Sequence, residues 1–285
     1  MPARLEDCTT LELPCPRKVH IQGHSKAGER TGFWVAEWKL VVDFGLSTYR
    51  SPKAGLVTHS HTDHTWCVPI TFTSRGKARN LYMPQACLVP LTMTERSIIS
   101  LSDGKICTLE PEEVWAEQKL NPVIISAGDV FSIPELDDLC VEVLPCYHTT
   151  ESVGYGFSTV TSKLKSEYKE LTGKEIGKLR RDGVEITERR VRPEFVIFGD
   201  TDIRALTDHD EWKKYPVILI ECTGYGKYRK AEDLIHMGHI HYDHLKPVIE
   251  SCENHFVLIH TSMAITANDI PRITKEINNS RVQFL

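Results

Sequence analysis

The chain has 285 residues, of which 41% are hydrophobic and 26% charged, and its formal net charge is −5. This composition is typical of a soluble globular protein with one large domain or two small ones, and an acidic chain is an unusual nucleic-acid binder unless positive charge gathers locally. No apolar run reaches the roughly 20 residues of a membrane-spanning helix, and the N-terminal MPARLEDCTT lacks the apolar core of a signal peptide. Nine cysteines without a Cys-x-x-Cys pair favour reduced thiols in an intracellular protein.

Short apolar strands alternate with helical stretches along the chain. We expect two strands joined by a polar turn in FWVAEWKLVVDFG (33–45), a buried strand in AGLVTHSH (54–61), and a loop followed by a strand in TSRGKARNLYMP (73–84). MTERSIISLSDG (93–104) and NDIPRITKEI (268–277) are expected to be helical. Later strands are expected in LCVEVLPCYHTT (139–150), EFVIFGDTD (194–202), PVILIECTG (216–224) and HFVLIHTSM (255–263). This alternation predicts a layered α/β fold.

The segment from 163 to 192 differs from the rest in charge. It contains 10 Lys and Arg and 6 Asp and Glu, a local charge of +4 inside an acidic chain, and few large apolar residues. One interpretation is a solvated surface excursion between two core strands. The other is a protruding basic arm that contacts an anionic partner.

The pattern His-x-His-x-Asp-His occurs twice, as HSHTDH at 59–64 and as HIHYDH at 239–244. The first copy follows the apolar GLVT and precedes Pro69, a residue that suits the first turn of a helix. His59 and His61 are two residues apart, so an extended backbone points both to one side, and Asp63 and His64 follow on the turn. This context predicts ligands for two zinc ions roughly 3.5–4 Å apart.

The second copy has a different context. KAEDLIHMG (230–238) is typical of a helix that ends at Gly238, and apolar residues after the motif recur at helical spacing. We therefore expect the second copy at a junction of two helices, without a metal ion of its own.

Three further residues with metal-binding side chains each come first after an apolar strand: His148, Asp200 and His260. Together with the first cluster they complete a set of seven nitrogen and oxygen ligands, in which Asp200 has the position of a bridging carboxylate. Such ligands favour a catalytic site with open metal positions over an all-thiolate structural site.

Several segments resemble the metallo-β-lactamase superfamily and, within it, tRNase Z of the short, plant-type form. They are GLVTHSHTDH, HTTESVGYGF, the basic segment STVTSKLKSEYKELTGKEIGKLRRDGVEIT, FGDT, ECT, GHIHYDHL and LIHTS. The resemblance covers almost the whole chain. It implies a four-layer αββα sandwich as one domain, 1–285, with an inserted tRNA-binding arm at 162–192. The implied activity is a zinc-dependent endoribonuclease that removes 3′ trailers from precursor tRNA.

The resemblance also implies a role for each site residue. One zinc ion would be held by His59, His61 and His148, and the other by Asp63, His64 and His260, with Asp200 bridging. Glu221 would orient His239, the first residue of the second copy, as the proton donor to the leaving oxygen. Asp63 would also accept a hydrogen bond from the attacking hydroxide. For His241, Asp243 and His244 the resemblance implies no function, and we expect them to be exposed residues of a helix.

Three features depart from the family pattern. Trp66 and Cys67 stand where two glycines are usual, HTSMAI after His260 lacks the usual arginine, and Ile220 stands where a histidine often precedes the glutamate. An alternative function is a hydrolase of the same fold that acts on a thioester, a lactone or a small phosphodiester, which would need neither the basic segment nor the Glu221–His239 pair. A non-catalytic member of the fold is a third hypothesis, although such proteins typically lose ligands.

The resemblance extends to assembly. It implies a homodimer that acts on precursor tRNA, with no membrane association. The expected compartment is the cytoplasm, with the nucleus or an organelle as alternatives.

Overall fold

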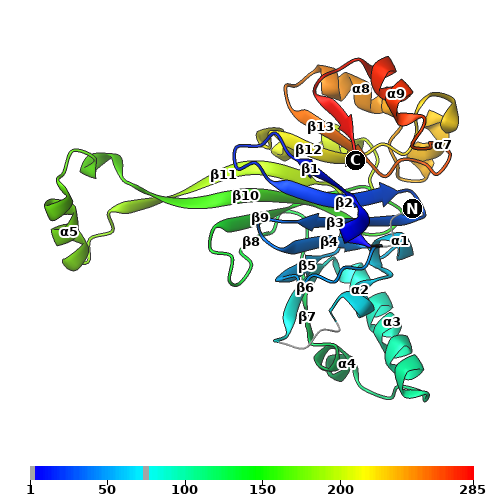
Figure 1. Ribbon diagram of the computed structural model, residues 1–285, viewed down its shortest axis with the longest axis horizontal. Coiled ribbons are helices and arrows are strands. Elements are labelled where there is room, and N and C mark those ends of the chain that lie inside the picture. The colour runs from blue at the N-terminus through cyan, green and yellow to red at the C-terminus, as the bar shows by residue number, and fades with distance from the viewer. Residues whose placement is uncertain (1–3, 73–76) are drawn as a thin grey trace.

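The computed structural model describes residues 4–72 and 77–285. In these residues two seven-stranded sheets lie face to face, with helices on their outer faces (Figure 1). The first sheet runs in chain order: β1 Thr9–Glu12, β2 His20–Lys26, β3 Arg30–Val35, β4 Leu40–Phe44, β5 Ala54–Leu56, β6 Arg79–Met83 and β7 Leu120–Ile124. The second has the order β14-β13-β12-β11-β10-β9-β8: β8 Val130–Phe131, β9 Leu139–Pro145, β10 Val153–Leu164, β11 Thr187–Ile197, β12 Val217–Glu221, β13 His255–Ile259 and β14 Val282–Phe284.

The central core lies between the two sheets. Val42 of the first sheet and Phe157 and Phe195 of the second belong to one buried cluster. Trp38, in the turn between β3 and β4, stacks on both phenylalanine rings, with centroids 6.1 and 6.2 Å away. Burial of large aromatic rings is among the strongest contributions to a core, so this contact fixes how the sheets face each other.

Two outer clusters add the helical layers. On the first sheet, α3 (Gln85–Asp103) and α4 (Pro111–Glu117) bury Leu91 and Trp115. On the second, α8 (Tyr242–Glu250) buries Leu245 and Ile249. The order of layers is helix, sheet, sheet, helix, which confirms the predicted αββα sandwich.

The carboxyl ends of several strands meet at one edge of the sandwich. β4 to β7 pair in parallel, as do β11 to β14, and β9 runs antiparallel to β10 and therefore in the direction of β11. Chain segments that leave β5, β9, β11, β12 and β13 consequently emerge side by side. This edge carries all the candidate site residues.

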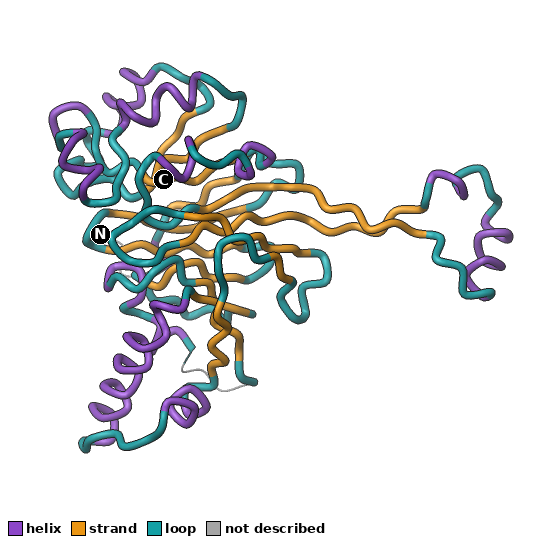
Figure 2. The backbone as a smooth tube through the Cα atoms, turned by 180° about the vertical axis from the view of Figure 1, so that it is seen from behind, coloured by secondary structure: helices purple, strands orange, loops and turns teal. Residues whose placement is uncertain are grey.

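The basic segment projects away from the sandwich. β10 and β11 continue pairing as far as Leu164 opposite Thr187, and α5 (Gly173–Arg181) lies at the far end (Figures 1 and 2). Thr172 begins α5 with a reciprocal capping box to Glu175, and no residue of α5 is buried. The segment is thus a two-stranded ribbon that extends the core strands, and not only a loop between them. Its 12-residue strand β10 spans about 40 Å.

The other predicted elements agree with the structure. The paired strands in 33–45 are parts of β3 and β4, the helix expected at 93–104 is the second half of α3, and α9 is Ile270–Ile277. Of the loop expected before β6, residues 73–76 lie outside the described residues, and Lys77 and Ala78 lead into the strand. Within the described ranges no helix combines the length and the apolar character needed to cross a membrane.

Candidate metal centre

The first histidine motif begins where a buried strand ends. His59 comes three residues after the last residue of β5, and His61 is the N-cap of the short helix α1 (Thr62–Thr65), which contains Asp63 and His64. Pro69 lies in the first turn of the next helix, α2 (Val68–Thr71), as predicted. His59 and His64 are buried and Asp63 is half-buried.

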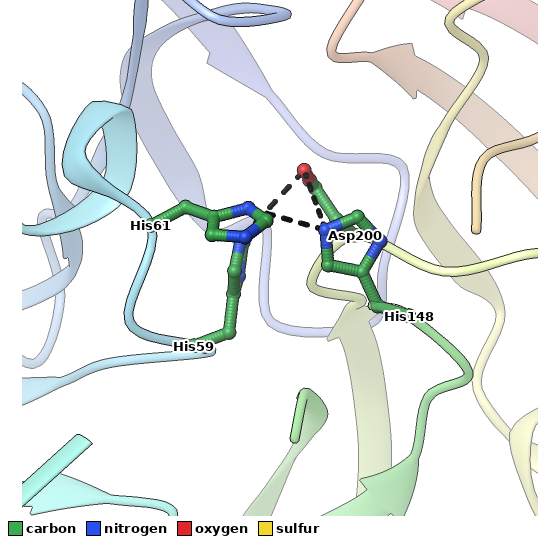
Figure 3. A group of neighbouring side chains, drawn as sticks. All are labelled: His59, His61, His148 and Asp200. Carbon is green, nitrogen blue, oxygen red and sulfur yellow. Dashed lines mark hydrogen bonds and ion pairs between the residues drawn. The ribbon is translucent and has the colours of Figure 1, made fainter. Parts of the chain in front are cut away.

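All seven predicted ligands converge at the same edge. The ligand atoms of a first set, His59, His61, His148 and Asp200, lie within 4.8 Å of one another, and those of a second set, Asp63, His64 and His260, meet the same limit. A third group within this limit joins Asp200 and His260 to Glu221 and His239. Figure 3 shows the four side chains of the first set pointing toward a common centre.

Asp200 lies between the two sets. Its carboxylate oxygens are 3.2 Å from Nε2 of His260, 3.4 Å from Nε2 of His64 and 3.7 Å from Nε2 of His59. A single carboxylate at this distance from histidines of both sets is the geometry that a bridging ligand requires.

The outer ring nitrogens of these histidines are held by the protein. Nδ1 of His64 donates to Asp43 at 2.7 Å, Nδ1 of His148 donates to the Gly238 carbonyl at 2.9 Å, and Nδ1 of His59 lies 3.0 Å from the Thr58 hydroxyl. Such bonds fix the tautomer and direct the other nitrogen inward, as is usual for metal-binding histidines.

The inward nitrogens lack partners in the protein. Nε2 of His59, of His64 and of His260 is buried and has no hydrogen-bond partner among the described residues. Buried polar atoms are normally satisfied, so three such nitrogens facing one carboxylate fit the coordination of a cation. Imidazole and carboxylate donors without thiolate suit zinc in a catalytic site. The residues therefore fit a group of divalent metal ions.

The pKa values of the site histidines also fit a metal site. Burial, with further lowering by neighbouring histidines, holds the pKa of His59 well below its usual value, and burial also lowers the pKa of His61 and of His148. This lowering favours the neutral ring, which is the form that binds metal. His64 is different: the charges of nearby aspartates, Asp200 first, outweigh burial and raise its pKa to about 9. The pocket is thus negative enough to hold a cation.

Glu221 and His239 form a pair beside the ligand cluster. Glu221 is the last residue of β12 and is fully buried, and its Oε1 lies 2.8 Å from Nδ1 of His239. The backbone N–H of Thr201 and of Ile240 and the hydroxyl of Thr223 also donate to this carboxylate.

His239 is held close to two of the predicted ligand histidines. Its ring centroid is 4.9 Å from that of His148 and 5.3 Å from that of His260. Burial alone would lower the pKa of His239, but the charge and hydrogen bond of Glu221 outweigh it and raise the pKa to about 9. The ring is therefore a cation that can donate a proton at neutral pH.

The second motif lies between two helices, as predicted. α7 (Ala231–His236) precedes it, Gly238 has a positive φ of 69°, and α8 follows. Asp243 is exposed as expected, but His241 is buried and His244 half-buried, so the expectation of exposed residues is wrong for both. His241 is buried because it caps α8: its Nδ1 accepts the N–H of Asp243, and its Nε2 lies 3.3 Å from the Gly226 carbonyl.

Sequence reasoning missed three groups that support the ligands. Asp43, at the end of β4, binds His64 and both the N–H and the hydroxyl of Thr58, and its φ of 57° is unusual for a residue other than glycine. The backbone N–H of Gly28 donates to Asp63 Oδ2 at 3.0 Å, and the Gly238 carbonyl holds His148. The position of Asp43 at a strand end was the one signal available in the sequence, and the two backbone groups left none.

The αββα layers with a histidine and aspartate cluster at the strand ends define a protein of the metallo-β-lactamase fold. Comparison with solved structures supports this fold. The metallo-β-lactamase fold protein YhfI from Bacillus subtilis superposes with a TM-score of 0.55 at 11% identity, and the match covers 93% of this chain and 95% of that one. Human tRNase Z, short form (ELAC1), has a TM-score of 0.54 at 13% identity, with the same coverage.

Sequence comparison narrows the relationship. The chain is a homologue of proteins named tRNase Z: it is 29% identical to tRNase Z TRZ1 of Arabidopsis thaliana over 255 residues, 88% of each chain. It is also 29% identical to the chloroplastic tRNase Z TRZ2 of Arabidopsis thaliana over 239 residues, 82% of this chain and 63% of that relative. No family model matches the chain. The predicted resemblance and the predicted fold are both confirmed.

Proposed function

We propose that this protein is a zinc-dependent endoribonuclease that removes 3′ trailers from precursor tRNA. Similarity to tRNase Z over 88% of the chain supports the substrate. The observation that carries the chemistry is the pair of buried Glu221 and half-buried His239, set directly against the predicted ligand histidines. A bare metal site would hydrolyse many substrates, whereas a positioned cationic donor suits a poor leaving group such as a ribose 3′ oxygen.

The ligand sets divide between two ions. His59, His61 and His148 would hold one zinc ion, Asp63, His64 and His260 the other, and Asp200 would bridge them. Bound zinc supplies Lewis acidity, which makes water acidic enough to attack at neutral pH and neutralises phosphodiester charge.

The remaining steps belong to the side chains. Asp63, aligned by the N–H of Gly28, accepts a hydrogen bond from the attacking water while it serves as a ligand. Protonated His239 donates its proton to the leaving 3′ oxygen of the tRNA body. Glu221 keeps the ring charged and oriented until the transfer, an arrangement that typically contributes 10²–10⁴-fold in rate.

The arm, residues 162–192, is proposed to bind the tRNA as an extension of a single domain, 1–285. Lys174, Lys178, Arg180 and Arg181 of α5 make no ion pair with another residue that the structure describes. β10 begins five residues after His148 and runs away from the site, so α5 lies about 40 Å from the ligand cluster. Only a large polyanion can contact both, and folded RNA read through its phosphates is such a substrate. No observation favours a thioester or a lactone.

Assembly and compartment complete the proposal. We infer a homodimer by similarity to tRNase Z and place the activity in the cytoplasm, with the nucleus or an organelle as alternatives. Relatives include a tRNase Z named chloroplastic and a ribonuclease Z named nuclear, from Triticum aestivum and 29% identical over 59% of this chain, so similarity alone does not select one compartment.

The test is cleavage of a 3′-extended precursor tRNA by the purified, zinc-loaded protein, with the cut site mapped and a thioester as the competing substrate. We expect one cut at the end of the tRNA body and no thioester hydrolysis. His61→Ala should lose zinc and activity together, whereas His239→Ala should retain zinc and lose kcat. Loss of zinc from His239→Ala would show that this residue is a ligand and not a proton donor.

A further inference from the structure

A cavity of about 640 Å³ opens beside the metal centre. Its walls include the predicted ligands His61 and Asp63, the polar residues Ser60 and Thr62, and the β2–β3 turn at Gly28. This volume lies within the range of roughly 300–1,000 Å³ typical of ligand sites. Any molecule bound at the metals can therefore extend into this cavity without leaving the site.

Two apolar side chains line the same cavity and face solvent. Trp66 is 65% exposed and Ile70 is 52% exposed. The ring of Trp66 makes no stacking or cation–π contact with another described residue. Large apolar side chains exposed together beside an active site mark a binding surface more often than an accident of folding. An indole adds a flat face on which another ring can stack.

The chemistry of the walls suits a nucleobase. Stacking on an aromatic side chain is how proteins bind single-stranded RNA without reading its sequence, and the serine and threonine hydroxyls can satisfy the polar edge of a base. A polymer cut at the metals must continue on both sides of the broken bond. A nucleotide next to the scissile phosphate is thus the group that lies within reach of the cavity.

The position of the proton donor His239 shows which side of the broken bond, the tRNA body or the trailer, lies in the cavity. The cavity walls contain His61 and Asp63 but neither Glu221 nor His239. His239 lies instead against His148 and His260. Because His239 protonates the 3′ oxygen of the tRNA body, the body occupies the side of that histidine. The cavity is left to the trailer, which retains the phosphate.

We propose that Trp66 and Ile70 form a subsite in which the first nucleotide of the 3′ trailer stacks its base on the indole of Trp66. The subsite rests on the proposed function, because it presupposes an RNA cut at the metals. It accepts any base, since every base has a flat face, and it acts on substrate binding more than on bond breaking.

The experiment compares Trp66→Phe, which keeps an aromatic face, with Trp66→Leu, which keeps apolar area alone. Tyr49→Ala serves as the control, because Tyr49 is 73% exposed, does not line the cavity, and stacks instead under Arg4. Each zinc-loaded protein is assayed on a precursor tRNA and on the same RNA with an abasic first trailer nucleotide. Binding of the 5′-phosphorylated trailer, with and without its first base, is measured by calorimetry.

We expect Trp66→Leu to raise KM and to weaken trailer binding roughly 5- to 150-fold, the range reported by aromatic-to-alanine changes, with kcat nearly constant. Trp66→Phe should recover most of the loss, Tyr49→Ala should behave as wild type, and the abasic RNA should make wild type and Trp66→Leu equal.

Three results would overturn the subsite while leaving the proposed function intact. The first is normal cleavage and trailer binding by Trp66→Leu, and the second is wild-type protein that cleaves and binds the RNA with the abasic first trailer nucleotide as well as the complete RNA. The third is a smaller molecular mass of Trp66→Leu in solution, which would mean that the apolar pair contacts a second copy of the chain. If wild type fails to cut precursor tRNA at all, the proposed function itself is wrong.

Discussion

A carboxyl group lies buried without a partner in the helical layer. Glu95 is fully buried on α3, four residues after Leu91 on the buried face, and neither of its oxygens has a hydrogen-bond partner among the described residues. Burial raises its pKa from the ordinary 4.5 to about 8, because the charged form loses its hydration. The group is therefore neutral in the folded protein at pH 7.

This burial makes stability depend on pH. Between about pH 4.5 and 8 the folded protein binds one more proton than the unfolded chain, so the free energy of unfolding falls as pH rises through this window. The slope is about 1.4 kcal/mol per pH unit, and the loss between pH 6 and pH 9 is about 3 kcal/mol. Glu95→Gln keeps the shape of the neutral acid and cannot ionise, so this loss should vanish.

The assay is urea unfolding at pH 6 and pH 9, followed by circular dichroism on zinc-loaded protein. The free energy of unfolding of Glu95→Gln minus that of wild type should be about 3 kcal/mol larger at pH 9 than at pH 6. Effects of pH on zinc binding are common to both proteins and cancel in this comparison. Glu112→Gln, an exposed change on α4, should give the same difference from wild type at both pH values. An equal difference at both pH values for Glu95→Gln would refute the reasoning.

Three further changes test the site and the arm. Asp200→Ala should lower both zinc content and activity, and undiminished zinc by elemental analysis would contradict the bridging role. A second variant replaces residues 163–188 by a Gly/Ser bridge between the paired Ser162 and Arg189. It should keep its zinc content and its hydrolysis of a small phosphodiester, but lose precursor tRNA binding and the salt dependence of that binding. Equal loss of both activities would show that the arm is structural. His241→Ala should lower stability by about 1 kcal/mol in urea unfolding through loss of the α8 cap, with full zinc content, whereas loss of zinc would assign it to the metal centre.

The fold could be predicted because its signals are local. The apolar runs 217–220 and 256–259 are buried parts of β12 and β13, which pair in parallel, and parallel strands gather the residues that follow them at one edge. His148, Asp200 and His260 are therefore near neighbours although they lie far apart in sequence. The arm was visible as a change in charge, but its ribbon was not, because exposed strands such as the outer half of β11 lack the apolar alternation that marks a half-buried strand.

Supporting groups could not be predicted because they depend on distant packing. Asp43 reaches His64 only after β4 and β5 pair, and Gly28 reaches Asp63 only after the β2–β3 turn folds over α1. Gly45 illustrates the same limit: a Cβ atom at this position would lie 2.0 Å from the carbonyl oxygen of Asp63, so only glycine fits. Such constraints come from residues that are close in space but distant in sequence, so local sequence patterns do not reveal them.

The two copies of His-x-His-x-Asp-His show why identical letters take different roles. In both copies the second histidine is the N-cap of a helix with an extended backbone, and the aspartate lies in its first turn. The difference is where that helix begins. His61 leaves its helix uncapped by a side chain and turns its Nδ1 to within 3.2 Å of Nε2 of His148, at the edge where the strands end. His241 uses one ring nitrogen to cap its own helix and places the other against the Gly226 carbonyl, so neither nitrogen remains for a metal ion. A ring with both nitrogens in backbone hydrogen bonds has none left for a metal ion, whereas His148 uses only one nitrogen in this way. The strand end, more than the motif, therefore determines which histidines are placed to hold a metal ion.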